Sequence, residues 1–118
     1  MSRHTVTFNV FDVVVVPFPF TDSATTKRRP ALVLSDNVNF NQPVGQSVLA
    51  MITSAANSDW PLDIEISDLD AAGLSSPSIV RMKIFTLDHQ FIIRKAGTLN
   101  KKDQTQVKQA FTKLFPLK

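Results

Sequence analysis

The sequence predicts a mainly β (α+β) protein, in which a small, strongly bent antiparallel sheet or open barrel is closed by one C-terminal amphipathic helix. Short β-branched or alternating apolar segments, separated by polar turns, occupy most of the chain. The last eighteen residues change to the period of a helix. A run of short strands followed by one helix is typical of this architecture. With 118 residues, we expect a single domain, residues 1–118.

The first expected strand is the four-valine run Val13–Val16, which is too short for a helix and is wholly β-branched. Because it does not alternate, both of its faces should be covered. Pro17 removes an amide donor and limits the ladder to an edge or an end. The polar stretch Thr21–Arg29 is expected to form a loop, and Pro30 to open a second strand, Ala31–Ser35.

Apolar runs and alternation predict the other strands, and clusters of Asn, Asp, Pro and Gly predict the connections. The expected strands are Ser47–Thr53, Leu62–Ile66, Ser78–Leu87 and Phe91–Leu99; the expected connections are a loop at Asp36–Gln46, a turn at Ala55–Asp59 and one helical turn at Asp68–Leu74 stopped by Gly73. The C-terminal helix should begin after Asn100 as its N-cap and end near Pro116. Its apolar stripe consists of Val107, Ala110, Phe111, Leu114 and Phe115.

Composition excludes several classes of chemistry. The chain has no cysteine and only two histidines, His4 and His89, so thiol nucleophiles and Cys-ligated metals are excluded. A multi-histidine metal site is not expected either, and we expect no metal and no cofactor. The longest apolar run is far too short to span a membrane, and no signal-peptide pattern follows the N-terminus. We therefore expect a cytoplasmic protein with no membrane partner.

Charge is informative only locally. The net charge is +3, but residues 101–118 carry five lysines against Asp103, so the rest of the chain is close to neutral. The bulk charge therefore does not indicate a nucleic-acid-binding face. The cluster Lys27-Arg28-Arg29 is different, because an arginine held before Pro30 at the rim of a strand can present its planar fork to a phosphate. A solvated basic loop explains the cluster as well, and fits Lys27 and Arg28 better than Arg29.

Other candidate residues have two readings each. The hydroxyls of Thr53 and Ser54, at a strand end, could donate to a phosphate or satisfy a turn. Arg81 interrupts an apolar stretch, so it needs solvent, a carboxylate or a ligand. Trp60 could be a stacking platform for a base or a lid on the core. From these residues alone, the sequence indicates a compact β-rich domain with one positioned basic loop.

Several stretches of the chain occur in an order that carries a family resemblance. They are FDVVVVPFPFTD (11–22), KRRPALVLS (27–35), MITS (51–54), PSIVRMKIFTLD (77–88) and IRKAGTL (93–99), which leads into the terminal helix. The ordered set resembles the MazF/PemK (Kid) family of toxin endoribonucleases over about residues 11–115. The first stretch begins Phe11-Asp12 where many members have Gly-Asp.

The resemblance implies a small SH3-like, CcdB-like antiparallel barrel that forms a homodimer with its RNA groove across the interface. It implies sequence-specific, metal-independent cleavage of single-stranded RNA to 2′,3′-cyclic phosphate and 5′-hydroxyl ends, and hence inhibition of translation. The expected partners are single-stranded RNA and a cognate antitoxin protein that occupies the RNA groove.

The resemblance assigns functional roles to the residues of this sequence that stand at the family's site positions. The resemblance implies that Arg29 and Thr53 are catalytic, and that the substrate-binding residues are Thr21, Asp22, Ser23, Arg28, Ser54, Arg81 and Lys83. Some members carry an aspartate where Lys83 stands, so the general base is open among Asp22, Asp88 and His89. Two alternatives to a nuclease remain: a non-cleaving binding module of the same fold, either gyrase-poison-like or RNA-binding, which Lys83 favours, and a plain structural interaction domain.

Overall fold

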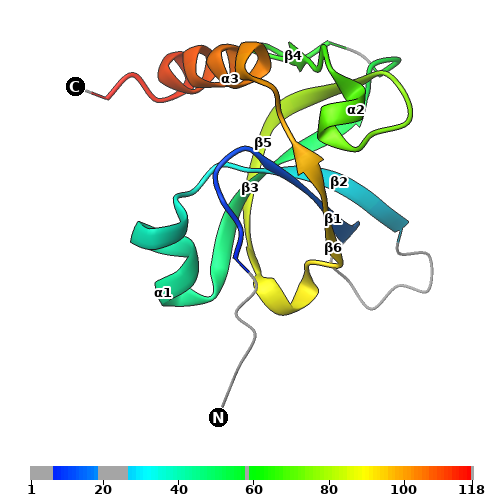
Figure 1. The fold of residues 1–118 in the computed structure, drawn as a ribbon. Coiled ribbons are helices and arrows are strands. Elements are labelled where there is room, and N and C mark those ends of the chain that lie inside the picture. The colour runs from blue at the N-terminus through cyan, green and yellow to red at the C-terminus, as the bar shows by residue number, and fades with distance from the viewer. Residues whose placement is uncertain (1–6, 19–26, 58, 118) are drawn as a thin grey trace.

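The protein folds as a six-stranded antiparallel sheet bent into a half-barrel (Figure 1), in a computed structural model that describes residues 7–18, 27–57 and 59–117. The strand order is β4-β5-β3-β2-β1-β6, and every neighbouring pair is antiparallel. The strands are β1 (Asp12–Phe18), β2 (Lys27–Val33), β3 (Gln46–Ser54), β4 (Ile64–Glu65), β5 (Ser78–Asp88) and β6 (Arg94–Thr98). The predicted fold class is confirmed.

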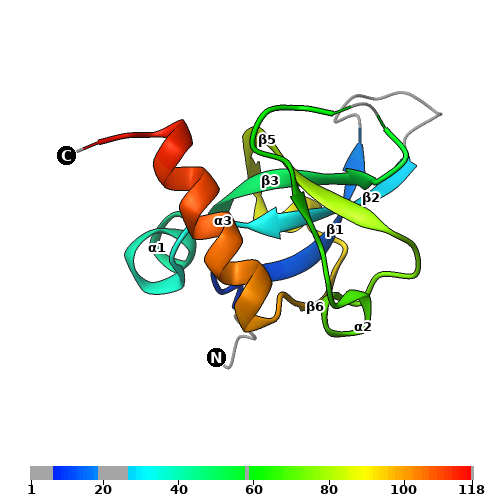
Figure 2. The same cartoon turned by 90° about the horizontal axis from the view of Figure 1, so that it is seen from above.

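Three α-helices and two single turns complete the described fold. They are the π-helical turn η1 (Asn37–Asn41), α1 (Gln42–Val44), α2 (Leu69–Ala72), the 3-10 turn η2 (His89–Phe91) and α3 (Lys101–Leu114). Helix α3 runs across the sheet in the view from above (Figure 2). None of the helices in the described ranges is long and apolar enough to cross a membrane.

Each face of the sheet carries its own apolar cluster, as expected for the valine run. Val13 and Leu32 lie in the first cluster, together with Val107 of α3. Val14 and Val16 point the other way, into the second cluster. All of these side chains are almost fully buried, because successive residues of a strand face opposite sides and both sides are covered here.

Strand β2 begins earlier than the sequence predicts. The segment Lys27–Arg29 is strand rather than loop, and Pro30 lies inside β2, opposite Val15 of β1. The ladder to β3 covers only Ala31–Val33, so one edge of β2 has no neighbouring strand at Pro30. A missing amide donor costs little at such an edge. As a result, Arg28 and Arg29 stand on a paired strand.

The expected loop at Asp36–Gln46 is instead folded into η1 and α1. The carboxylate of Asp36 accepts a hydrogen bond from the Asn39 amide at 2.7 Å. Asn41 is fully buried and donates through Nδ2 to the carbonyls of Phe8 and Ser35, each at 2.9 Å. Hydrogen bonds between polar side chains and the backbone therefore hold this segment in a helical conformation, which its composition alone does not reveal.

Two expected strands are shorter than their sequence patterns. Within Leu62–Ile66, only Ile64–Glu65 pairs with β5, although Ile64 and Ile66 are buried on either side of exposed Glu65, as the alternation predicts. Within Phe91–Leu99, only Arg94–Thr98 is strand, and Phe91 belongs to η2, which the Asp88 side chain caps by accepting from the Gln90 amide.

Helix α3 begins where predicted. The Asn100 side chain accepts from the amide of Asp103 at 2.9 Å. Only the first part of the predicted stripe is covered: Val107 and Ala110 are buried, whereas Phe111 and Phe115 are 38% and 44% exposed. Phe111 and Phe115 lie against each other, with ring centroids 5.0 Å apart.

Helix α2 stops at Gly73, as predicted, and packs tightly on β6. Gly73 has a φ of +73°, a conformation that glycine adopts readily. A Cβ on Gly73 would lie 2.1 Å from the Ala96 carbonyl oxygen, and one on Gly97 would lie 2.3 Å from the Ala71 carbonyl oxygen. This contact places the segment after α2 beside the ends of β2 and β3.

Candidate functional site

Arg29 and Thr53 are brought together by the register of β2 and β3. The last pair of that ladder is Ala31 with Met51. Arg29 and Thr53 are each two residues beyond this pair, so they lie on the same face of their strands. Both line two adjoining hollows in the surface. These two residues, which the sequence singles out, therefore form the wall between the hollows.

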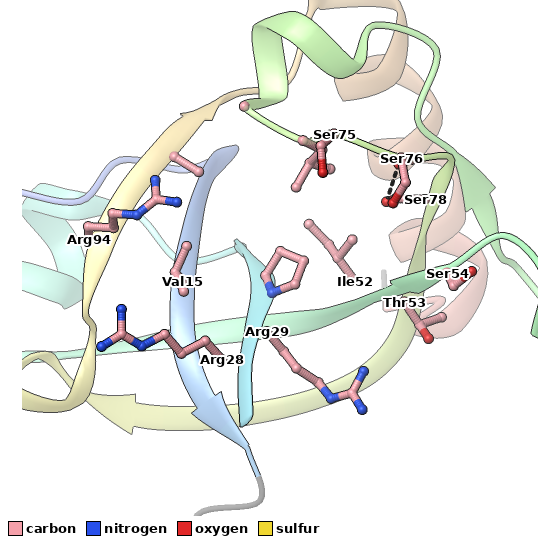
Figure 3. Close-up of a pocket in the computed structure, with 14 residues that line it drawn as sticks. Val15, Arg28, Arg29, Ile52, Thr53, Ser54, Ser75, Ser76, Ser78 and Arg94 are labelled. Atoms are coloured by element: carbon pink, nitrogen blue, oxygen red, sulfur yellow. Dashed lines mark hydrogen bonds between the residues drawn. The ribbon is translucent and has the colours of Figure 1, made fainter. Parts of the chain in front are cut away.

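The first hollow, which we call the serine groove, has a volume of about 350 Å³. Figure 3 shows its side chains: Arg28 extends toward the Arg94 side, and Arg29 toward the Thr53 side. Its lining consists of Val15, Arg28, Arg29, Pro30, Ile52, Thr53, Ser54, Gly73, Leu74, Ser75, Ser76, Ser78, Arg94 and Ala96. No acidic residue is in this described lining. None of its three arginines forms an ion pair with any residue that the structure describes.

The second hollow, which we call the lysine groove, has a volume of about 240 Å³. It lies on the other side of the Arg29–Thr53 wall, and its lining consists of Phe18, Arg29, Met51, Ile52, Thr53, Asn57, Arg81 and Lys83. Its described lining also lacks an acidic residue. The two grooves together give an anionic ligand a path with Arg29 and Thr53 at its centre.

The hydroxyl of Thr53 is held by a neighbour that the sequence analysis did not single out. Asn57, in the turn after β3, donates through Nδ2 to Thr53 Oγ1. A threonine hydroxyl has one donor and two acceptor positions, so this bond leaves its hydrogen available. Ser54 serves the turn itself, because its Oγ accepts from the Ala56 amide at 3.2 Å.

Arg81 forms an ion pair with the carboxylate of Asp63, which is one of the three kinds of partner that its apolar surroundings require. Its guanidinium donates to both oxygens of Asp63, from Nη2 at 2.9 Å and from Nε at 3.2 Å. Burial raises the pKa of Asp63, but the hydrogen bonds from Arg81 and from the Trp60 amide lower it more, so the pKa lies below its ordinary value. The hydrogen bond to Asp63 in turn raises the pKa of Arg81.

Trp60 is 41% exposed, so it is not a lid on the core. Two cations of β5 approach its ring: the Arg81 Cζ lies 5.3 Å and the Lys83 Nζ 5.2 Å from the centroid. Both belong to the lining of the lysine groove. The ring therefore lies beside the cationic side of that groove and contacts both of its β5 cations.

Two of the three candidates for a general base, Asp88 and His89, lie away from Arg29 and Thr53. Asp22 lies outside the described residues, as do Thr21 and Ser23. Asp88 pairs with Gln46, at the opposite end of β3 from Thr53, which is about 23 Å along the strand at roughly 3.3 Å per residue. His89 follows it and contacts Ser47, with 2.7 Å between Nε2 and Oγ. Neither Asp88 nor His89 reaches Thr53 of the same chain.

Sequence reasoning missed Arg94, Asn57 and Asp63. Arg94 sits in one of the resembling stretches, but nothing in its local pattern separates it from Lys95. Only the β1–β6 pairing brings it opposite Val15 and so to the serine groove. Asp63 alternates with Leu62 and Ile64, as a solvent-facing strand residue would, which hides its pairing with Arg81.

The bent sheet, with arginines of β2 and β6 that form no ion pair among the described residues, defines a small half-barrel protein with a cationic site suited to an anionic ligand. The chain belongs to the PemK-like, MazF-like toxins of type II toxin–antitoxin systems, whose sequence profile matches residues 9–115. No curated protein sequence matches the chain.

Solved structures of similar fold agree with this family. MazF from Deinococcus radiodurans is 18% identical, with a TM-score of 0.74 over 96% of this chain and 100% of that one. Mycobacterium tuberculosis toxin MazF-mt6 is 20% identical, with a TM-score of 0.70 over 91% and 98%. An endoribonuclease in complex with its cognate antitoxin, from a mycobacterial species, is 14% identical, with a TM-score of 0.73 over 93% and 96%.

Proposed function

We propose that this toxin is an endoribonuclease that cleaves single-stranded RNA at Arg29 and Thr53 without a metal ion. The observation that carries the proposal is the position of these two residues on the shared wall of two grooves that contain no described acidic side chain. The names of the structural neighbours, which include endoribonucleases, support the same reaction class.

The proposed reaction is an internal transesterification. The ribose 2′-oxygen loses its proton and attacks the adjacent phosphorus, and the bond to the 5′-oxygen of the next nucleotide breaks. That oxygen takes up a proton, so the products are a 2′,3′-cyclic phosphate and a 5′-hydroxyl, with no water consumed. Negative charge grows on the non-bridging oxygens in the transition state, and preorganised donors aimed at that charge lower the barrier.

Arg29 and Thr53 are suited to this charge. The Arg29 guanidinium has no ion-pair partner among the described residues, so its donors are available to a phosphate. The Thr53 hydroxyl, which Asn57 holds from its acceptor side, can donate its hydrogen to the same phosphate. Arg28, Ser54, Arg81 and Lys83 line the two grooves and are proposed to bind substrate, together with Thr21, Asp22 and Ser23.

The wider biological role follows from this reaction. We propose that the toxin recognises a short RNA sequence, cleaves mRNA in the cytoplasm and so inhibits translation. A homodimer and a cognate antitoxin protein are the proposed assemblies, and neighbours described as complexes with a cognate antitoxin or as MazE–MazF support the second.

A second candidate is a binding module of the same fold that does not cleave. The ion pair of Arg81 with Asp63 favours it, because a guanidinium already held by a carboxylate has fewer donors left for a phosphate. This module would use the same grooves to hold RNA or a protein partner.

The test is a cleavage assay on a long single-stranded RNA in EDTA. Wild-type protein, Arg29→Ala and the charge control Lys113→Ala, on the exposed face of α3, are compared. We expect 5′-hydroxyl fragments from wild type and Lys113→Ala, and none from Arg29→Ala. Intact RNA from folded wild-type protein that still binds RNA would replace the nuclease with the binding module. Cleavage that EDTA abolishes would overturn metal independence.

A further inference from the structure

Two arginines of the serine groove are not assigned to the scissile phosphate, which the proposed reaction places at Arg29 and Thr53. Arg28 and Arg94 come from β2 and β6, and both side chains lie on the side of the groove away from Thr53 (Figure 3). Both side chains are exposed, and neither has an ion-pair partner in the described part of the chain.

Strand pairing holds these arginines around an apolar floor. Arg94 pairs with Val15, and Val15 pairs with Pro30, in one row across β6, β1 and β2. Arg28 is two residues from Pro30 and therefore shares its face of the strand. Neighbouring strands are about 4.8 Å apart, so the backbones at Arg94 and Pro30 are separated by about two such spacings. The floor is thus wide enough for one ribose or base.

The opposite wall of the groove is polar and firmly placed. The segment after α2 contributes Ser75 and Ser76 to the lining, and both lie across the groove from Arg28 in Figure 3. The close approach of Gly73 and Gly97 to the neighbouring backbone fixes α2 on β6. Hydroxyls on a rigid wall are suited to reading a base edge or a ribose, whereas cations on the rim are suited to phosphate.

The charge of the groove is suited to an anion. Arg28, Arg29 and Arg94 border a hollow of about 350 Å³, with no acidic residue in its described lining. Like charges gathered in this way repel each other, and a polyanion relieves the repulsion. One phosphate at Arg29 leaves Arg28 and Arg94 uncompensated.

We propose that the serine groove is a second nucleotide subsite, in which Arg28 and Arg94 bind the phosphate next to the scissile one. The inference rests on the proposed function, because it places the RNA strand across the Arg29–Thr53 wall. Val15, Pro30 and Ile52 contact the ribose or base of the neighbouring nucleotide. Arg94 is thereby assigned as a substrate-binding residue. Since this contact is made equally in the ground state and the transition state, it lowers KM and leaves kcat unchanged.

The experiment compares Arg94→Gln and Arg28→Gln with wild type and with Lys102→Gln, an exposed lysine of α3 that serves as the matched charge control. Substrates are oligoribonucleotides with one cleaved bond, and in each of two analogues a neutral methylphosphonate replaces one phosphate flanking that bond. We expect Arg94→Gln to raise KM roughly tenfold at unchanged kcat, as loss of one charge-assisted hydrogen bond implies. One of the two analogues should raise the wild-type KM by a similar factor.

The decisive comparison is the variant with that analogue. If Arg94 binds the phosphate that the analogue replaces, Arg94→Gln causes no further rise in KM with that analogue. The effects of the substitution and of the analogue on KM are then not additive. The proposed subsite would be overturned if the rises in KM were additive with both analogues. A wild-type KM for folded Arg94→Gln would overturn it as well. If wild type cleaves nothing, the proposed function fails instead. Binding of the same oligonucleotides, measured by fluorescence anisotropy, then tests the subsite by the same non-additivity.

Discussion

Arg29 of β2 and Thr53 of β3 lie two residues beyond the last pair of one ladder, Ala31 with Met51, and both line the serine groove and the lysine groove. A cation and a hydroxyl on one wall can act on the same phosphate, while the rest of the RNA strand continues into either groove.

Removal of the Thr53 hydroxyl should affect the chemical step. Thr53→Val keeps the shape of the side chain but loses its donor, and loss of one preorganised donor costs on the order of 10²–10³ in kcat. Thr53→Ser, which keeps the hydroxyl, should retain most of the activity. Single-turnover cleavage of a short RNA measures both, and a wild-type rate for Thr53→Val would remove this residue from the catalytic centre.

Asn57 is expected to act through Thr53. Asn57→Leu removes the donor to Oγ1 and lets the hydroxyl rotate, so kcat should fall by roughly tenfold with little change in KM. Asn39→Leu, an exposed asparagine in η1, is the matched control. In the Thr53→Val background, Asn57→Leu should cause no further loss. An equal loss in both backgrounds would show that Asn57 does not act through Thr53.

The Arg81–Asp63 pair should stabilise the fold. Asp63→Asn leaves a nearly buried guanidinium without its charge partner, so thermal unfolding should shift down by roughly 5 °C. Replacing both members, as in Asp63→Leu with Arg81→Met, should recover part of that loss, because neither charge is then left unpaired. A double variant less stable than Asp63→Asn would contradict this assignment.

Gly97 is expected to tolerate no side chain. Gly97→Ala would bring a Cβ to 2.3 Å from the Ala71 carbonyl oxygen, so α2 must shift, at a cost of about 1–3 kcal/mol. Because the segment after α2 lines the serine groove, KM for RNA should rise as well. Gly45→Ala, where a Cβ meets nothing within 4 Å but φ is +71°, should cost only backbone strain and leave KM unchanged. Urea unfolding and cleavage kinetics measure both effects.

His89 should make stability depend on pH. Burial lowers its pKa from the ordinary 6.5, against the opposing influence of Asp88 and of a hydrogen bond with the Gln46 backbone. At a pH between the lowered pKa of His89 in the folded protein and 6.5, the unfolded chain binds a proton that the folded chain does not. The free energy of unfolding therefore falls as pH decreases through that window. His89→Gln should flatten this slope in urea titrations at pH 5–7, and an unchanged slope would contradict the assignment.

The fold was largely predictable because burial on both faces leaves a clear pattern. Local sequence alone accounts for three of its features: the valine run, the alternation around Ile64 and the Asn100 cap. The segments at Lys27–Arg29 and Asn37–Asn41 were not predictable, because strand pairing in the first and buried asparagine contacts in the second override local polarity.

The candidate site was predictable only in part. Arg29 and Thr53 were identified through a family resemblance, and the structure brings them together. Arg94, Asn57 and Asp63 are brought to the site by contacts across strands and turns, which a single sequence does not encode locally. Phe11 adopts φ +74°, which fits the glycine that many family members have there, yet its buried side chain belongs to the first apolar cluster.

The most direct test of the central claim uses one RNA oligonucleotide with a single 2′-deoxy substitution at the cleaved nucleotide. If Arg29 and Thr53 stabilise attack by the ribose 2′-oxygen, wild-type protein in EDTA will cleave the all-ribose strand to a 2′,3′-cyclic phosphate and a 5′-hydroxyl. It will leave the substituted strand intact while binding it with similar affinity. Cleavage of the substituted strand at the same bond would contradict the mechanism, because no nucleophile would remain within the substrate.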